Sequence, residues 1–357
     1  MNIMHIIFSF NNGGSENLII NLFNAWPNHE DNLFLCIVND FYDQKLLDKI
    51  NDNVVIYKLN RKPGENKFNG MSKLRHLVKE NKIDLIHCHS NNVLKYAVVA
   101  LFMYKLKLKF VLTIHNDTIY PSLSKYEVIL HKIFLNQITA ISESVKDSII
   151  KNNFSEKKIS VIYNGIDFNK YKKNLSTDDN IQILCVGRMV PSIKGQDILL
   201  RAITIITEKY RNIRCVFAGG NPENEDNISK LKKLSNELGI SSYVTFLGDC
   251  HDVSQQLQQS DILVVPSREE GFGLVAIEGM AAYVPVIASN VGGLAEIIQN
   301  GYNGYLFEKE NYTELAELIL KVMKQDNQEL TSNAYKRAFN QFNICRTSEE
   351  MRLAYLK

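Results

Sequence analysis

The segment Ser267–Glu278, with the sequence SREEGFGLVAIE, places two carboxylates beside a glycine-containing turn. It follows a short apolar stretch, so it lies at the carboxyl end of a predicted strand, where open α/β sheets bind ligands. Gly271 and Gly273 permit close backbone approach, and the helix expected after them directs free N–H groups at an anion such as phosphate. Glu270 and Glu278 are hydrogen-bond acceptors only, which suits the hydroxyl groups of a sugar or ribose. The structural alternative is a glycine turn and a helix whose dipole favours an acid.

Two cationic side chains, Arg188 and Lys194, follow another predicted strand, Ile181–Val186. A guanidinium binds phosphate oxygens in pairs and an ammonium adds a compact charge, so together they suit a diphosphate. We find no acidic pair with the spacing of a magnesium site, since Asp178 and Asp179 are adjacent. The pattern predicts diphosphate binding without a metal ion, and a surface lysine is the structural alternative for Lys194 alone.

A third candidate site lies near the start of the sequence, where Gly13 and Gly14 join the first predicted strand to the first helix. The glycines are not part of a G-x-G-x-x-G fingerprint, which argues against a dinucleotide ligand. The structural alternative is a simple turn in which Ser15 caps the helix.

Two histidines, His87 and His89, end the predicted strand Leu85–His89 and share one face of it by alternation. Their spacing raises the question of a metal site, but no third ligand is evident nearby in the sequence. We expect His87 to be a hydrogen-bonded core residue and His89 to line the acceptor site. Histidines outside any motif, His5 among them, are expected to have no role in the chemistry.

Short apolar stretches alternate with segments of helical periodicity along the whole chain, a pattern typical of parallel sheets covered by helices. It pauses near Asn164–Asp167, where a polar stretch follows, and then restarts. We therefore predict an α/β fold with two Rossmann-like domains, residues 1–168 and 169–344, and a helix, residues 345–357, that packs back on the first. The length of 357 residues also gives two domains at about 150 residues each.

The composition, 45% hydrophobic and 22% charged with a net charge of +2, excludes a disordered chain and argues against a general nucleic-acid binder. Six cysteines without CxxC spacing indicate a reducing compartment. The longest apolar run, Tyr96–Tyr104, is far shorter than the roughly 20 residues of a membrane-spanning helix. We therefore expect a cytoplasmic protein. The eight basic residues from Lys58 to Lys82 form either a solvated surface or a patch that meets anionic lipid headgroups.

Together these segments resemble the retaining glycosyltransferases of family 4. Ser267–Glu278 is similar to the family's E-x7-E motif, and Gly187–Gly195 to its G-R-x5-K-G element. Asn164–Asp167 resembles the interdomain N-G-[IV]-D motif, and Gly13–Glu16 the G-G-x-E loop. His115 matches the family's sugar-contacting histidine. Other segments follow the family order: Phe246–Gly248, Gly292–Glu296 and Asn303–Leu306.

The resemblance implies a GT-B fold, in which two Rossmann-like domains face each other across a cleft. The first domain would bind the acceptor and the second the nucleotide sugar. The implied catalytic residues are Glu270, His115, Arg188 and Lys194. The implied donor-binding residues are Gly13, Gly14, Arg188, Lys194, Glu270, Gly271, Phe272, Gly273, Leu274, Val275 and Glu278. Glu16 and His89 would lie on the acceptor side.

The implied reaction is the retaining, metal-independent transfer of a hexose or N-acetylhexosamine from a nucleotide sugar, without a further cofactor. UDP-sugars are favoured and GDP-mannose comes second. The acceptor would be a saccharide or lipid-linked saccharide in cell-surface polysaccharide biosynthesis, such as lipopolysaccharide or capsule, at the inner face of the plasma membrane. A nucleotide-sugar epimerase or phosphorylase of the same fold and a non-catalytic sugar-binding protein are the alternatives. The choice between front-face attack and double displacement stays open.

Overall fold

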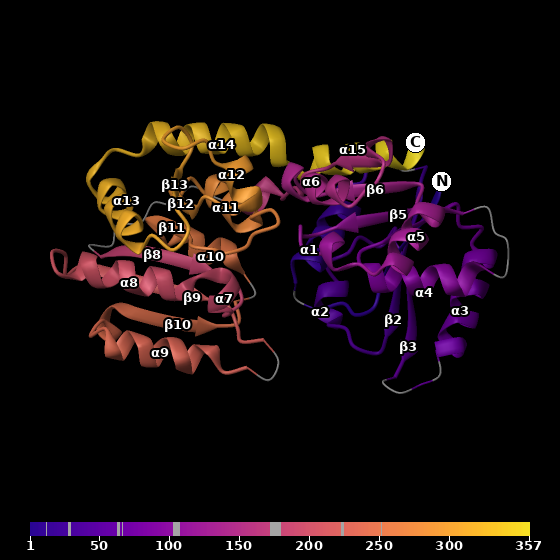
Figure 1. Cartoon of the computed structure of the whole chain (residues 1–357), viewed down its shortest axis with the longest axis horizontal. Helices are drawn as coiled ribbons and strands as arrows, with labels where there is room; N and C mark the ends of the chain where they lie inside the picture. Colours follow the sequence, from indigo (N-terminus) through magenta and orange to yellow (C-terminus); the bar gives the residue numbers. More distant parts are fainter. Residues whose placement is uncertain are drawn as a thin grey trace. The chain divides into compact units, whose positions relative to one another are not determined.

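The computed structural model describes residues 1–11, 13–27, 30–62, 65, 67–102, 108–171, 180–222, 225–250 and 252–357, so Asp178 and Asp179 lie outside the described residues. The chain forms two compact units, shown with their elements in Figure 1. Unit 1 is Met1–Gly165 with Ile344–Lys357, and unit 2 is Ile166–Asn343. The division precedes the predicted residue 168 because Ile166 forms a β-bridge with Asn343 within unit 2.

Unit 1 contains a parallel seven-stranded sheet in the order β3-β2-β1-β4-β5-β6-β7. Its strands are β1 (Asn2–Ile7), β2 (Asn32–Asn39), β3 (Val55–Arg61), β4 (Leu85–Cys88), β5 (Lys109–Ile114), β6 (Gln137–Ala140) and β7 (Ile159–Val161). Its helices are α1 (Gly14–Asn24), α2 (Gln44–Leu47), α3 (Lys67–Glu80), α4 (Asn91–Phe102), α5 (Lys125–Phe134), α6 (Glu143–Lys151) and α15 (Ile344–Leu356). Short 3-10 turns are η1 (Tyr120–Ser122) and η2 (Glu156–Lys158).

Unit 2 contains a parallel six-stranded sheet in the order β10-β9-β8-β11-β12-β13. Its strands are β8 (Ile181–Val186), β9 (Ile213–Ala218), β10 (Val244–Gly248), β11 (Ile262–Val265), β12 (Val286–Ser289) and β13 (Tyr305–Phe307). Its helices are α7 (Pro191–Lys194), α8 (Gln196–Thr207), α9 (Asn227–Glu237), α10 (Val253–Gln258), α11 (Leu274–Ala281), α12 (Gly292–Ile297), α13 (Tyr312–Lys324) and α14 (Gln328–Phe342). Its 3-10 turns are η3 (Phe168–Lys170) and η4 (Ser241–Tyr243).

The α/β fold with two Rossmann-like parallel sheets is therefore confirmed. The central strands of each sheet are buried on both faces, which explains their unbroken apolar sequences. The order of the first five strands in unit 1, 3-2-1-4-5, is that of a dinucleotide-binding fold and puts β1 beside β4.

The last helix of the chain, α15, belongs to unit 1. Met351, Ala354 and Tyr355 are buried in the same apolar core as side chains of β1 and β2. In Figure 1, α15 is the yellow helix near the label C, and it contacts α1 and β6. No helix in the described ranges has both the length and the apolar character needed to cross a bilayer.

Candidate active site

In unit 2, the predicted phosphate-binding lysine and the first predicted carboxylate form an ion pair. Lys194 Nζ donates to Glu270 Oε2 over 2.7 Å, and Ser267 Oγ donates to the same oxygen over 3.1 Å. Lys194 ends the short helix α7, and the other two residues lie in the loop that leaves β11. The side chains of Lys194 and Glu270 are mostly shielded, with 26% and 14% exposed. The carboxyl ends of β8 and β11, neighbours in the sheet, thus bring together residues 76 positions apart.

Glycines let the loops of this site pack backbone to backbone. Gly195, in the left-handed region at φ 64°, leaves no room for a β-carbon, which would lie 1.9 Å from the carbonyl oxygen of Pro266. A β-carbon on Gly292 would lie 2.1 Å from the carbonyl oxygen of Glu270. The amide of Gly293 donates to that oxygen over 3.1 Å, so α12 holds the loop that carries Glu270.

Arg268, which the sequence argument missed, fastens this loop to the segment that carries Lys194. Its guanidinium donates to both carboxylate oxygens of Asp197, at 2.7 and 2.9 Å, and to the carboxylate of Glu310. It also donates to the carbonyl of Pro191 over 2.5 Å. Hydrogen bonds to Asp197, and then to Glu310, raise the pKa of Arg268. The two acids are 71 and 42 positions from Arg268, so nothing in the sequence signalled this clamp.

The helix that follows, α11, begins as the sequence predicts. Gly273 is its N-cap at φ 109°, and no side chain caps it. The first-turn amides of Leu274 and Val275 therefore lack an intrahelical acceptor and can bind an anion. Phe272 is buried and its ring contacts Phe342 edge-on, which fixes the start of the helix. Gly271, which directly precedes Phe272, is half-buried.

The second predicted carboxylate, Glu278, lies on α11 and is paired with a tyrosine. Tyr171 donates a hydrogen bond to the Glu278 carboxylate. Burial raises the pKa of Glu278 to about 7, although the Tyr171 hydrogen bond and the charge of Lys170 act in the opposite direction. Tyr171 was not expected at this site, because it belongs to the polar stretch that follows Asn164–Asp167.

Not every predicted residue of unit 2 joins this group. The side chain of Arg188 is exposed, and its backbone carbonyl accepts from Gln196 over 2.9 Å. Within the described residues, no recorded hydrogen bond links Arg188 or Glu278 to Glu270. Among the described residues of unit 2, Lys194 and Glu270 are thus hydrogen-bonded to each other, while Arg188 and Glu278 have other hydrogen-bond partners.

In unit 1, the loop before α1 places Glu16 against Gly13. Ser15 Oγ donates to Glu16 Oε2 over 2.7 Å, and a β-carbon on Gly13 would lie 2.5 Å from that oxygen. Gly14 starts α1 with open space around it. The alternative that Ser15 caps the helix is wrong, because Gly13 occupies the N-cap and no side chain caps it.

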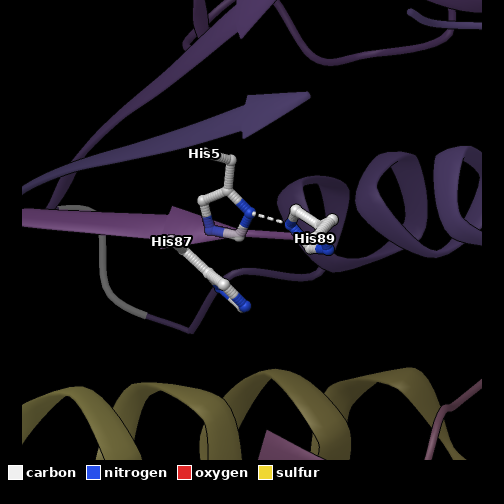
Figure 2. A group of neighbouring side chains, drawn as sticks. All are labelled: His5, His87 and His89. Carbon is white, nitrogen blue, oxygen red and sulfur yellow. Dashed lines mark hydrogen bonds between the residues drawn. The ribbon is translucent and has the colours of Figure 1, made fainter. Parts of the chain in front are cut away.

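Three histidines of unit 1 cluster on one face of its sheet (Figure 2). Nitrogens of His5, His87 and His89 all lie within 4.8 Å of one another. The expectation that His87 and His89 have no third histidine nearby is wrong, because the register of β1 and β4 pairs His5 with His87. Pairing between strands 80 residues apart is not visible in a single sequence. His87 is a hydrogen-bonded core residue, as predicted, with Tyr355 Oη at 2.5 Å and Thr113 Oγ1 at 2.6 Å.

These histidines are joined to one another and to the core by hydrogen bonds. His5 Nδ1 and His89 Nε2 are 2.9 Å apart, and Tyr355 Oη is 3.1 Å from His5 Nε2. Burial is the largest cause that lowers the pKa of all three histidines well below 6.5, so they are neutral near pH 7. Among the described residues, His89 Nδ1 is the one ring nitrogen of this cluster that is buried without a partner.

His115 follows β5 and stacks on His89, with ring centroids 5.9 Å apart. Its Nε2 is also buried without a partner in the described part of the chain, and burial lowers its pKa to about 4. Two neighbouring imidazoles thus each have a nitrogen ready to bind a ligand.

Comparison with known proteins identifies the family of this chain. Residues 12–170 match the family described as "Glycosyltransferase Family 4", and residues 167–341 match "Glycosyl transferases group 1". An uncharacterized glycosyltransferase of Methanocaldococcus jannaschii is 35% identical over 78% of this chain and 77% of its own length. The chain therefore belongs to the family 4 glycosyltransferases, and its fold is GT-B.

Two other similar proteins have more specific descriptions. The capsular polysaccharide biosynthesis glycosyltransferase CapM of Staphylococcus aureus is 32% identical over 61% of this chain and 60% of its own length. The Anabaena protein HepE, solved in complex with UDP and glucose, superposes with a TM-score of 0.86 at 23% identity, covering 99% of both chains.

Proposed function

We propose that this glycosyltransferase moves a hexose or N-acetylhexosamine from a UDP-sugar to a saccharide or lipid-linked saccharide, with retention of configuration. The observation that carries the proposal is the Lys194–Glu270 pair beside the uncapped start of α11. The UDP and glucose bound by HepE support the donor, and the role named for CapM supports an acceptor in cell-surface polysaccharide. GDP-mannose is the second donor.

In this proposal, unit 2 stabilises the leaving diphosphate. Lys194, Arg188 and the first-turn amides of α11 supply the positive charge, so that no metal ion or other cofactor is needed. A diphosphate would replace the Glu270 carboxylate as the partner of Lys194. The released carboxylate would then accept from the sugar hydroxyls.

The other predicted residues bind hydroxyl groups. Glu278 would accept hydrogen bonds from the ribose. In unit 1, Glu16 and His89 would bind the acceptor. His115 and the amides of Gly13 and Gly14 would bind the transferred sugar.

A thermal-shift panel tests the choice of donor. At 100 times its Kd, UDP stabilises the unit that binds it by about 2.7 kcal/mol, a shift of roughly 5–10 °C for a unit of this size. We expect GDP and ADP to give smaller shifts. A larger shift with GDP would replace UDP by GDP-mannose as the donor. Chromatography of UDP-sugar incubated without acceptor should show no epimer.

We further propose that unit 1 meets the inner face of the plasma membrane through α4 and α5. Five apolar side chains on these helices are at least half exposed: Val99, Phe102, Tyr126, Ile129 and Ile133. The exposed apolar side chains of α5 recur at helical spacing. They lie next to a hollow whose mainly apolar lining includes Phe102 and Ile133. The acid of these two helices, Glu127, is neutralised by Lys95 at 2.7 Å, while Lys125 and Lys132 remain exposed. An apolar surface with an excess of positive charge suits an anionic bilayer.

The basic residues from Lys58 to Lys82 suit this role less well. Lys58 donates to Gln44, Arg61 to Asn39 and Lys73 to the carbonyl of Leu59, so these cations are engaged within unit 1.

Co-sedimentation with vesicles separates the two surfaces. Ile129→Glu together with Ile133→Glu should reduce binding to anionic vesicles at least 10-fold, because two charges would enter the interface. Leu353→Glu, a matched change at an exposed leucine of α15, should leave binding unchanged. Equal binding by wild type and the double variant would reject the α4–α5 surface, and loss of binding in Lys79→Glu with Lys82→Glu alone would favour the basic stretch.

A further inference from the structure

Six side chains of unit 1 form one continuous chain of hydrogen bonds, here called the relay. It runs from β6 through β5 and β4 to α15, and returns through β1 to the end of β4. The neighbouring oxygen and nitrogen atoms are 2.6, 2.6, 2.5, 3.1 and 2.9 Å apart in the order Thr139, Thr113, His87, Tyr355, His5 and His89. In Figure 2, a dashed line joins His5 to His89, and His87 turns toward the yellow helix α15.

Hydrogen counting shows that the relay has a single direction. A neutral imidazole has one N–H and one bare nitrogen, and a hydroxyl has one hydrogen. An inner imidazole has two partners, so it must donate to one and accept from the other. A buried hydroxyl that accepted from both partners would leave its own hydrogen unpaired, so Thr113 and Tyr355 likewise each donate to one partner and accept from the other. If one bond reverses, every other bond must reverse too, and the proton of His89 moves between its two nitrogens.

The distances at Tyr355 select one direction. A hydroxyl donates over shorter distances than an N–H group does. Tyr355 Oη is 2.5 Å from His87 Nδ1 but 3.1 Å from His5 Nε2, so it donates to His87 and accepts from His5. His5 Nδ1 is then bare and accepts from the Nε2–H of His89. All three imidazoles carry hydrogen on Nε2, the tautomer that a free histidine side chain prefers.

The open end of the relay is therefore the bare Nδ1 of His89. This nitrogen is buried and has no partner among the described residues. A bare, neutral nitrogen accepts a hydrogen bond from a hydroxyl group and repels the oxygens of a carboxylate or phosphate. The neighbouring His115 Nε2 is a second unpartnered buried nitrogen on the same side. A buried nitrogen of this kind costs free energy unless a ligand or a water molecule donates a hydrogen bond to it.

We infer that His89 Nδ1 accepts a hydrogen bond from a hydroxyl of the acceptor saccharide, and that Tyr355 is a positioning residue that holds His89 in the tautomer this requires. The inference rests on the proposed function, in which unit 1 binds the acceptor. It makes α15, the last helix of the chain, part of the acceptor site through a phenol that need not touch the acceptor.

The tautomer is tested without substrate. Side-chain ¹⁵N NMR of the full-length protein should show His89 with hydrogen on Nε2 and a bare Nδ1. Tyr355→Phe removes one oxygen and keeps the ring that stacks on Trp26. In this variant His5 Nε2 loses its acceptor, so the His5 proton is free to move to Nδ1. A second His89 population, with hydrogen on Nδ1, should then appear.

Tyr120→Phe is the matched control. Tyr120 is equally buried in unit 1, and its hydroxyl is 3.1 Å from Nδ1 of another buried histidine, His131. We expect a similar loss of stability in both variants but unchanged His89 signals in Tyr120→Phe. With a UDP-sugar and a saccharide acceptor, Tyr355→Phe should raise the acceptor KM about 3- to 10-fold, the effect of one neutral hydrogen bond, at unchanged donor KM.

Each result decides a separate part of the inference. Hydrogen on Nδ1 of His89 in the wild type would overturn the direction of the relay. Identical His89 spectra of wild type and Tyr355→Phe would overturn the coupling. A changed tautomer with an unchanged acceptor KM would overturn the role in acceptor binding. If the wild type transfers no sugar while the spectra agree with expectation, the proposed function fails and the relay stands.

Discussion

Replacing Lys194 with alanine is expected to lower kcat for sugar transfer about 100- to 1,000-fold, as removal of one preorganised donor to a developing charge does elsewhere. The ammonium pairs with Glu270 over 2.7 Å and is largely shielded from water, so its charge acts in a partly desolvated site. Among the described residues, the variant also leaves Ser267 as the one hydrogen-bond partner of the Glu270 carboxylate. UDP release in a coupled assay measures the change, and circular dichroism checks the fold.

The double variant Lys194→Ala with Glu270→Gln tests whether the two residues act as a pair. Its loss should be smaller than the product of the two single losses, because each single change already breaks the ion pair. Lys233→Ala, which removes an exposed lysine that is 3.8 Å from Glu237, should retain full activity. Wild-type turnover by Lys194→Ala would remove this residue from the catalytic site.

The affinity for UDP-glucose is expected to rise about 10-fold between pH 6 and pH 8. Burial raises the pKa of Glu278 to about 7 in the free protein, so the carboxyl group is mostly protonated at pH 6 and mostly ionised at pH 8. The ionised form accepts a hydrogen bond from each ribose hydroxyl at full strength, whereas in the protonated form one oxygen carries a hydrogen that must itself be donated. An acid with a raised pKa gains its charge as the pH rises through that value. The Kd for UDP-glucose should therefore fall as the pH rises from 6 to 8. Calorimetric titration at several pH values measures it.

Two features keep this experiment specific to Glu278. UDP-glucose is a diester of diphosphate without a titrating oxygen in this range, unlike UDP. Glu278→Gln keeps the size of the side chain and its contact with Tyr171 but does not titrate, so its Kd should be constant. A constant Kd in the wild type, or the same slope in the variant, would show that Glu278 does not govern donor binding.

Sequence reasoning predicted local features of the fold and site well. Alternating apolar strands and amphipathic helices predict both sheets, because a buried parallel strand has to be apolar on both faces. Gly273 could be assigned to the turn before a helix because glycine adopts positive φ without strain, and it does so here. Lys194 and Glu270 were expected at one site because each follows a strand of the same sheet, and the structure pairs them.

The residues that were missed depend on contacts between distant segments. Arg268 was visible in the sequence, but its partners are distant in it: Asp197 lies in the first turn of α8 and Glu310 in the loop after β13. His5 was dismissed because its role follows from the pairing of β1 with β4. Tyr355 reaches the same cluster from the opposite end of the chain. A single sequence contains all of these residues but does not show which of them come into contact.

The membership of α15 in unit 1 also bears on how the protein is made. Unit 2 is one uninterrupted stretch, whereas unit 1 is assembled from two stretches that unit 2 separates. Domains usually fold in the order in which the ribosome releases them. Here the strands of unit 1 emerge first, yet its core is completed last, when Met351 and Tyr355 finally arrive. Part of the core of unit 1 therefore stays uncovered until the second half of the chain has been synthesised. Unit 2 can fold before unit 1 is complete.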